Sequence, residues 1–460
     1  MRFLIPLFLA IAIFHVQSLS VHASAAPERP NFLVILCDDL GYGDLACFGN
    51  KTIKTPCLDK LAGEGMRLTA CYAAAPVCSP SRTGMLTGRT PNRVGVYDWI
   101  PHGSPMHMPA SEVTVASLLK QAGYATCHVG KWHCNGKFNS PEQPQPGDHG
   151  FDHWFSTQNN AHPTHHNPKN FVRNGRPVGR QEGYSSSVVA GEAIGWLEGR
   201  KDKSRPFALF VWFHEPHEPI ASPEKYTKLY PEATKRGEAL YYANVTQMDS
   251  QVGRLMDALD RLDHRENTFV LFTSDNGPET LNRYRGAWRS HGTPGPLNGM
   301  KLWMYEGGIR VPGIIRWPGK TRPGQVCDEA VCGVDLLPTI CRIVGIDAPR
   351  DRTLDGASFL PIFEGKPVKR TKPLYWQYDR ALDWATVAMR DGDWKILADP
   401  QLKRFELYHV KEDIAEQHNL ADQEPERLKN MAATLAALHR EVKEEGPTWP
   451  DRKPSRKAKH

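Results

Sequence analysis

The sequence lacks long hydrophobic runs, and this absence excludes a protein that spans a membrane several times. The apolar stretch from Phe3 to Phe14 is shorter than the roughly 20 residues of a membrane helix, and no later segment approaches that length. An excess of charge of one sign is also missing. A formal net charge of +6 over 460 residues is mild, so it would help to attract acidic substrates but does not predict nucleic-acid binding.

A regular cysteine framework is absent as well. Ten cysteines are present, but their spacing gives no pairing, and Cys37 lies inside an apolar run where a core position is expected. The N-terminus has the features of an export signal: Arg2, the apolar run, and Ala23-Ser24-Ala25 as a cleavage site. We therefore expect an exported protein, periplasmic or extracellular.

Four apolar segments end in polar residues that could carry chemistry. Continuous apolar runs predict strands buried on both faces of a largely parallel sheet, and ligands bind at the carboxyl ends of such strands. The segments are Phe32 to Cys37 before Asp38-Asp39, Tyr124 to Val129 before Gly130-Lys131-Trp132-His133, Phe207 to Phe213 before His214-Glu215-Pro216-His217, and Thr268 to Thr273 before Asp275-Asn276. Helices are expected between them, at 56–64, 113–122, 186–198 and 241–262.

The C-terminal part of the chain has a different pattern. After residue 347 the sequence is rich in turns, and short segments at 374–378, 384–390, 394–398 and 406–409 predict antiparallel strands, followed by a helix at 424–443. We expect a signal peptide at 1–25, a catalytic α/β domain at 26–365, a small antiparallel-sheet domain at 366–447 and a basic tail at 448–460.

The segment from Asn135 to Gly183 is rich in Pro, Asn, Gly and His, and we expect a long loop over the edge of the sheet. Its histidines have no accompanying Cys or acidic ligand set, which disfavours a zinc site. The pattern favours polar surface or a substrate subsite. Together with the stretch around Tyr378-Asp379-Arg380, this segment is where substrate specificity is expected to lie.

Asp38, Asp39, Asp275 and Asn276 offer oxygen ligands only. Such a set suits a hard cation, calcium or magnesium, and argues against zinc. Adjacent aspartates also occur in turns and helix caps, so Asp38 and Asp39 alone leave both interpretations open. The second pair at a matching strand end favours a metal.

Cys78 begins the run Cys-Ser-Pro-Ser-Arg, and no base stands beside it. Ser79 suits a helix N-cap and Pro80 the first helical position, while Arg82 supplies a cation one turn later. Position 78 is therefore expected at the positive end of a short helix, where an anion can bind; a buried structural cysteine is the alternative.

The complete pattern, Cys-x-Pro-Ser-Arg-x4-Thr-Gly, resembles the signature of the type I sulfatases, in which the cysteine is oxidised to formylglycine. The resemblance runs from about Asn31 to Leu420, and its closest branch is that of N-acetylgalactosamine-6-sulfatase and arylsulfatase A. It implies an alkaline-phosphatase-like α/β fold with a small C-terminal domain, and hydrolysis of sulfate esters. It also implies a maturation enzyme that generates formylglycine as a partner.

The resemblance implies a role for each motif residue. Lys131 and Lys301 contact the sulfate, although a lone loop lysine such as Lys301 is otherwise usually a surface residue. His133 lies beside the formylglycine, and His217 lies on the leaving-group side, with His214 as an alternative. Arg82 joins the cationic cluster, and the divalent ion, usually calcium, is held by Asp38, Asp39, Asp275, Asn276 and the formylglycine at 78.

The leading expectation for the substrate is N-acetylgalactosamine 6-sulfate or a related galactose sulfate. A general arylsulfatase, a phosphoester or phosphonate hydrolase of the same fold, and a non-catalytic glycan-binding relative are the alternatives. Cys78 and the all-oxygen ligand set count against a phosphatase that uses Ser or Thr and zinc. No motif residue is missing, which counts against a binding protein. The compact length favours an exported bacterial protein over a lysosomal one.

Overall fold

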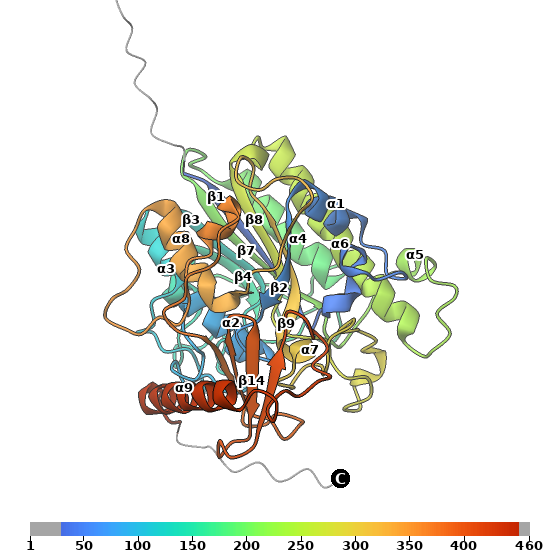
Figure 1. Ribbon diagram of the computed structural model, residues 1–460. Helices are drawn as coiled ribbons and strands as arrows, with labels where there is room; N and C mark the ends of the chain where they lie inside the picture. Colours follow the sequence, from blue (N-terminus) through green and yellow to red (C-terminus); the bar gives the residue numbers. More distant parts are fainter. Residues whose placement is uncertain (1–28, 450–460) are drawn as a thin grey trace, which may run out of the picture.

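The computed structural model describes residues 29–449 (Figure 1). The predicted signal peptide and residues 450–460 of the predicted basic tail lie outside the described residues. Within 29–449, no helix combines the length and the apolar character needed to cross a membrane.

A large mixed sheet forms the centre of the molecule, with strand order β10-β2-β9-β8-β1-β7-β3-β4-β5-β6 and β11 paired to β2. The four predicted strands are its parallel core, and β1 lies between β7 and β8. Their bounds are β1 (Asn31–Asp38), β3 (Ala125–Lys131), β7 (Phe207–Pro216) and β8 (Thr268–Ser274). This confirms the predicted α/β fold with a mostly parallel sheet.

The sequence did not predict the remaining strands of this sheet. On one side, β9 runs antiparallel to β8 and β2, while β10 and β11 run parallel to β2. The strands are β2 (Met66–Tyr72), β4 (His153–Thr157), β5 (Val172–Arg173), β6 (Arg176–Pro177), β9 (Arg310–Arg316), β10 (Gln325–Cys327) and β11 (Val331–Cys332).

Helices cover both faces of the sheet because alternate residues of its central strands face opposite cores. Phe32 and Val34 of β1 pack against one group of helices, and Leu33 and Ile35 pack against the other. The first group is α2 (Cys78–Thr87), α3 (Val115–Gln121) and α8 (Leu336–Val344); the second is α1 (Pro56–Glu64), α4 (Ser185–Gly199) and α6 (Glu238–Arg261). The short helices α5 (Glu224–Thr227) and α7 (Glu306–Ile309) complete this part.

The expectation of a loop over residues 135–183 is wrong in part. Strand β4 pairs in parallel with β3 and extends the sheet, and β5 and β6 form a hairpin at its edge. The expectation of polar surface is also wrong for His149 and His165, which are buried. Strand β4 is short and its neighbours in the sequence are polar, so its own sequence does not predict a strand. Pairing with the edge of β3 stabilises its extended conformation.

A second, four-stranded antiparallel sheet follows, as predicted, in the order β12-β13-β14-β15. One face packs on α9 through residues such as Met389 and Leu435, and the other packs on the segment that carries Cys78 through Trp376 and Leu397. The elements are β12 (Leu374–Gln377), β13 (Val387–Asp391), β14 (Trp394–Ala398), β15 (Phe405–His409) and α9 (Pro425–Glu445).

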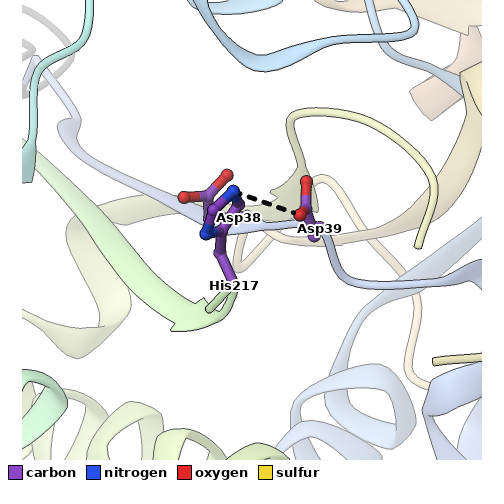
Figure 2. A group of neighbouring side chains, drawn as sticks. All are labelled: Asp38, Asp39 and His217. Carbon is purple, nitrogen blue, oxygen red and sulfur yellow. Dashed lines mark ion pairs between the residues drawn. The ribbon is translucent and has the colours of Figure 1, made fainter. Parts of the chain in front are cut away.

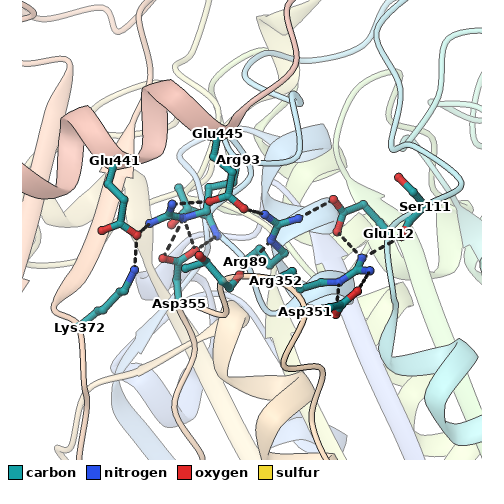
Figure 3. A network of polar contacts seen from close by, with 12 residues as sticks. Arg89, Arg93, Ser111, Glu112, Asp351, Arg352, Asp355, Lys372, Glu441 and Glu445 are labelled. Carbon is teal, nitrogen blue, oxygen red and sulfur yellow. Dashed lines mark hydrogen bonds and ion pairs between the residues drawn. The ribbon is translucent and has the colours of Figure 1, made fainter.

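An ion-pair network joins α9 to the chain that follows α2 (Figure 3). Arg93 lies 3.0 Å from Asp355, 3.0 Å from Glu441 and 2.6 Å from Glu445, and Arg89 also pairs with Glu445. Because the guanidinium of Arg93 is buried, these pairs are screened less than surface ion pairs. The network fixes the C-terminal helix against the domain that carries Cys78.

A buried charged cluster beneath the second sheet gives a stability prediction. Lys395 Nζ lies 2.9 Å from Glu306 and 2.8 Å from Glu416, and none of the three side chains is exposed. Burial disfavours the Glu306 carboxylate, but the Lys395 ammonium and the Arg310 guanidinium lower its pKa to about 2. Lys395→Met would remove the ammonium shared by Glu306 and Glu416, leaving Glu306 its pair with Arg310 and Glu416 buried beside a like charge, and the free energy of unfolding should fall by about 3–5 kcal/mol.

Urea unfolding followed by tryptophan fluorescence measures this loss. The control is Lys403→Met, which removes an exposed lysine from the turn between β14 and β15. Equal stability of the two variants would contradict the prediction.

Candidate active site

The carboxyl ends of β1, β3, β7 and β8 meet at one edge of the sheet and bring the predicted polar residues together. Asp38 is the last residue of β1, and Lys131 is the last residue of β3. Asn276 follows β8, and its amide nitrogen donates to Asp39 Oδ1 at 2.7 Å. All four side chains are buried.

Cys78 is the first residue of α2 and lies beside this group of polar residues. The expected N-cap, Ser79, is wrong: the helix begins after Val77, which is extended, and Ser79 Oγ accepts a hydrogen bond from the Ile100 N–H at 3.0 Å. All ten residues of α2 are buried. Burial raises the pKa of the Cys78 thiol to about 11, against the opposing effect of Lys131 and Lys301, so an unmodified Cys78 is a protonated thiol at neutral pH.

Three carboxylates face three cations around Cys78. Lys131 Nζ lies 2.5 Å from Asp38 Oδ2 and Lys301 Nζ lies 2.7 Å from Asp39 Oδ1. Arg82 completes the set at 2.7 Å from Asp275 Oδ2. Lys301 is 4% exposed, so it is a buried residue and not the usual surface lysine.

Arg82 lies behind the aspartates. Its guanidinium donates to Asp275 and to the Lys131 carbonyl oxygen, and it packs over the ring of Trp212. It is fully buried and does not line the cavity next to Cys78. Arg82 therefore fixes Asp275 and the end of β3 in place.

The pKa values of Asp38 and Asp275 are shifted in opposite directions. Burial disfavours ionisation of Asp38, but Lys131, His217 and Arg82 hold its pKa well below the usual range. Burial and the neighbouring Asp38 charge raise the pKa of Asp275 above the usual range. The Asp38 and Asp275 carboxylates therefore repel each other, and a bound cation would relieve this repulsion.

The residues at this edge fit a hard divalent cation. Asp38 Oδ1 and Asn276 Oδ1 are buried and have no hydrogen-bond partner within residues 29–449. Ligand atoms of Asp38, Asp39 and His217 lie within 4.8 Å of one another (Figure 2). Oxygen donors dominate the set, as calcium prefers, and His217, at 3.5 Å from Asp39 Oδ2, is a neighbour that the predicted ligand set did not include.

Two histidines face the cavity next to Cys78. His133 Nε2 lies 3.0 Å from the Ile100 carbonyl oxygen, which can only accept, so Nδ1 is left as a proton acceptor. Burial, with Lys131 and Arg82, holds the pKa of His133 well below the usual range, so its ring is neutral at neutral pH. His217 Nδ1 lies 2.5 Å from the Glu218 carbonyl oxygen, which leaves Nε2 toward Asp39.

The alternative histidine, His214, has another role. Its Nε2 pairs with Thr157 Oγ1 at 2.7 Å, and its side chain is buried. His217 lines the cavity and His214 does not. Sequence spacing alone left this choice open.

The cavity above these residues has a volume of about 440 Å³. The two segments where specificity is expected to lie, 135–183 and the stretch around 378–380, both contribute side chains to the cavity lining. It also includes residues for which the sequence held no signal, because they lie on loops after α2 and β8: Trp99, Glu279, Arg283 and Tyr284.

Asp44 anchors the loop that follows the paired aspartates and gives a pH prediction. It accepts hydrogen bonds from Gly41, Tyr241 and Thr293, yet burial raises its pKa to about 7. The folded protein therefore keeps a proton on Asp44 that the unfolded chain loses near pH 4. Below about pH 4 the proton on Asp44 makes its full contribution to the free energy of unfolding. This contribution falls by about 1.4 kcal/mol per pH unit as the pH rises to about 7.

Urea unfolding at constant calcium, at pH 4.5–7.5, measures this slope. Asp44→Asn should remove the contribution, so that the difference in unfolding free energy between wild type and variant changes with pH in this window. Asp422→Asn, at an exposed aspartate, is the control. A difference that stays constant across the window would contradict the prediction.

Comparison with known proteins finds relatives over most of the chain. Residues 30–346 match the family model described as Sulfatase, and residues 300–445 match the model described as N-sulphoglucosamine sulphohydrolase, C-terminal. The chain is 33% identical over 389 residues to human N-acetylgalactosamine-6-sulfatase, with 79% of this chain and 71% of that protein covered. It is 32% identical over 452 residues to mouse steryl-sulfatase, with 78% and 69% covered.

Solved structures share the fold over 91% of this chain. The structure of Ps i-CgsB in complex with k-i-k-neocarrahexaose has a TM-score of 0.79 and 26% identity, and covers 91% of this chain and 94% of that chain. A protein of Bacteroides thetaiotaomicron, from a locus for the metabolism of multiple glycosaminoglycans, has a TM-score of 0.76 and 26% identity, and covers 91% of this chain and 100% of that chain.

Proposed function

The chain belongs to the sulfatase family of sulfuric ester hydrolases, and we propose that it releases sulfate from a sulfated glycan, through a formylglycine made from Cys78 and a bound calcium ion. One observation carries the proposal: Cys78, His133, His217 and Lys301 line one cavity, and Lys301 and His217 contact Asp39 of the oxygen-ligand set. A sulfate ester needs this set, because its shielding oxygens must be neutralised before sulfur can be attacked.

Asp38, Asp39, Asp275 and Asn276 are the residues that would hold the cation. A bound divalent ion supplies Lewis-acid polarisation and lowers the pKa of a nearby hydroxyl. In the structure Lys131 and Lys301 are each paired with an aspartate of this set. Once Asp38 and Asp39 bind a cation, both ammonium groups can turn to the sulfate oxygens.

Formylglycine accounts for the chemistry that Cys78 cannot perform. As its hydrate it supplies two hydroxyls on one carbon, one to attack sulfur and a second whose deprotonation expels sulfate. A protonated thiol, with its pKa near 11, is a poor nucleophile and has no second group to expel the product. A maturation enzyme that oxidises Cys78 is therefore part of the proposal.

The two histidines have suitable positions for opposite proton transfers. His217 faces the cavity, and when protonated at Nε2 it would donate to the departing alcohol oxygen. His133, neutral and with Nδ1 free, would take the proton that must leave a formylglycine hydroxyl. Arg82 keeps the Asp275 side chain and the Lys131 backbone in position through its hydrogen bonds to both.

The substrate proposed is N-acetylgalactosamine 6-sulfate or a related galactose sulfate. Support comes from relatives named as N-acetylgalactosamine-6-sulfatase and from a structural neighbour solved with a neocarrahexaose. The N-terminal export pattern supports action in the periplasm or outside the cell.

A panel of esters tests the proposal. Sulfate release would be measured on 4- and 6-sulfated N-acetylgalactosamine and galactose and on an aryl sulfate, with protein whose conversion at position 78 is verified by mass spectrometry. A preference for one sulfated sugar is the expected result. Failure on every sulfate ester, with hydrolysis of phosphate esters instead, would overturn the proposal.

A further inference from the structure

A buried ion pair lies directly beside His217 and has no part in the chemistry proposed above. Glu218 follows His217 in the chain, is 5% exposed and does not line the cavity. Its carboxylate accepts from the Ile220 N–H at 3.0 Å, the Arg289 N–H at 3.1 Å, Arg289 Nε at 2.8 Å and a terminal guanidinium nitrogen of Arg289. Because a carboxylate offers about four acceptor sites, the Glu218 side chain has none left for a substrate or a metal.

Arg289 is itself held from two sides. Its guanidinium packs over the ring of Trp288 at 4.6 Å, and a Cβ atom at Gly237 would come within 2.9 Å of its Cγ, so its stem lies against the start of α6. Arg283 and Tyr284, which line the cavity, precede it on the same loop. The Glu218–Arg289 pair therefore ties the turn after β7 to the loop after β8, and both of these segments contribute to the cavity lining.

The backbone of Glu218 sets the orientation of the His217 ring. The Glu218 carbonyl oxygen lies 2.5 Å from His217 Nδ1 and can only accept, so Nδ1 carries a proton and Nε2 faces Asp39 (Figure 2). On the other side, the His217 N–H donates to the His214 carbonyl oxygen at 2.9 Å. Since one residue supplies both the carboxylate and the carbonyl, the contact with Arg289 limits how far the carbonyl, and with it the imidazole, can turn.

We infer that Glu218 is a positioning residue for His217 and that Arg289 holds Glu218 in place. The inference rests on the proposed function and deepens it, because a proton donor must point at the departing oxygen in the transition state. Glu218 touches no substrate and transfers no proton. It acts through the direction of His217 Nε2.

The first test compares two leaving groups. A sugar alkoxide leaves poorly and needs the proton from His217, whereas 4-nitrophenolate is a stable anion that can leave without one. For Glu218→Gln, kcat on a sulfated sugar should fall about 10–100-fold with little change in KM, and kcat on 4-nitrophenyl sulfate should fall less than about threefold. The retained activity on the aryl ester shows that the variant is folded.

Glu232→Gln, at an exposed glutamate between α5 and α6, is the matched control and should leave both rates unchanged. Equal losses on the two esters in Glu218→Gln, or no loss on the sugar, would overturn the inference.

The second test asks whether Glu218 acts through its two partners. Because Glu218 and Arg289 form one unit, Glu218→Gln/Arg289→Gln should lower kcat on the sugar about as much as either single variant. In a His217→Ala background, Glu218→Gln should lower kcat by less than about twofold, since the ring to be positioned is gone. Losses that multiply in either combination would overturn the inference.

A chemical experiment separates this inference from the proposed reaction. Diethyl pyrocarbonate modifies neutral imidazoles, and mass spectrometry locates the modified residue. His217 should react several-fold faster in Glu218→Gln than in the wild type, relative to the 76% exposed His418 of the same sample, because the released ring turns and exposes both nitrogens. An unchanged rate would overturn the inference, whatever the activity. The proposed function fails separately, if wild-type protein with converted Cys78 releases no sulfate from any ester.

Discussion

Cys78→Ala abolishes sulfate release, with an expected loss in kcat of roughly 10⁴-fold or more, the magnitude seen when a nucleophile is removed. The reason is structural as well as chemical. Position 78 is the only point of α2 that lines the cavity, and it shares that lining with Lys301, His133 and His217, which would act on the ester.

Initial rates on the preferred sulfated sugar measure the effect, with conversion of the wild type at position 78 verified by mass spectrometry. Cys47→Ala is the control, since Cys47 is partly exposed and lies outside the cavity. A Cys78→Ala variant that keeps full turnover would exclude formylglycine as the nucleophile. A wild type that is active but unconverted would exclude it as well.

Chelation of divalent cations lowers activity by about 10³-fold or more, because several kcal/mol of charge stabilisation are lost from the transition state. Added Ca²⁺ should restore the rate. The two lysines add a further expectation. Because Lys131 and Lys301 can pair with Asp38 and Asp39, the metal-free protein should stay folded, and its circular dichroism spectrum should change little.

Asp39→Ala is the genetic equivalent of chelation, but with one difference. The variant should lose activity to a similar extent and should no longer recover when Ca²⁺ is added, since one oxygen ligand is missing. Asp422→Asn is again the control. Full activity in a chelator, with no metal found by elemental analysis, would contradict the prediction.

The core of the fold was predictable because its strands are apolar on both faces. The helix at 56–64 was predicted with its observed bounds, and the expected sulfatase family is confirmed by the family model that matches residues 30–346. The strand ends were predicted only approximately: the apolar runs stop at Cys37 and Val129, whereas β1 continues to Asp38 and β3 to Lys131, because pairing in the sheet holds these buried polar residues in extended backbone.

Other features depend on partners that are distant in the chain. Strand β4 is stabilised by pairing with β3. Helix α2 begins after the extended residue Val77, and Ser79 does not cap it. The choice of His217 over His214 also had no signature, because which of the two side chains lines the cavity becomes visible only in three dimensions. The spacing of the cysteines likewise predicted no disulfide pairing, and all ten cysteines are free in the structure.

The complete burial of α2 implies an order of events during synthesis. Under the proposed function an oxidising enzyme must reach Cys78, yet in the folded protein this residue is 3% exposed and packs in one cluster with residues of the second sheet. The covering strand β12 is made about 300 residues after Cys78, which at 5–20 residues per second leaves roughly 15–60 s. We therefore expect conversion to take place on the nascent or newly released chain, and a fully folded, unconverted protein to be a poor substrate for its maturation enzyme.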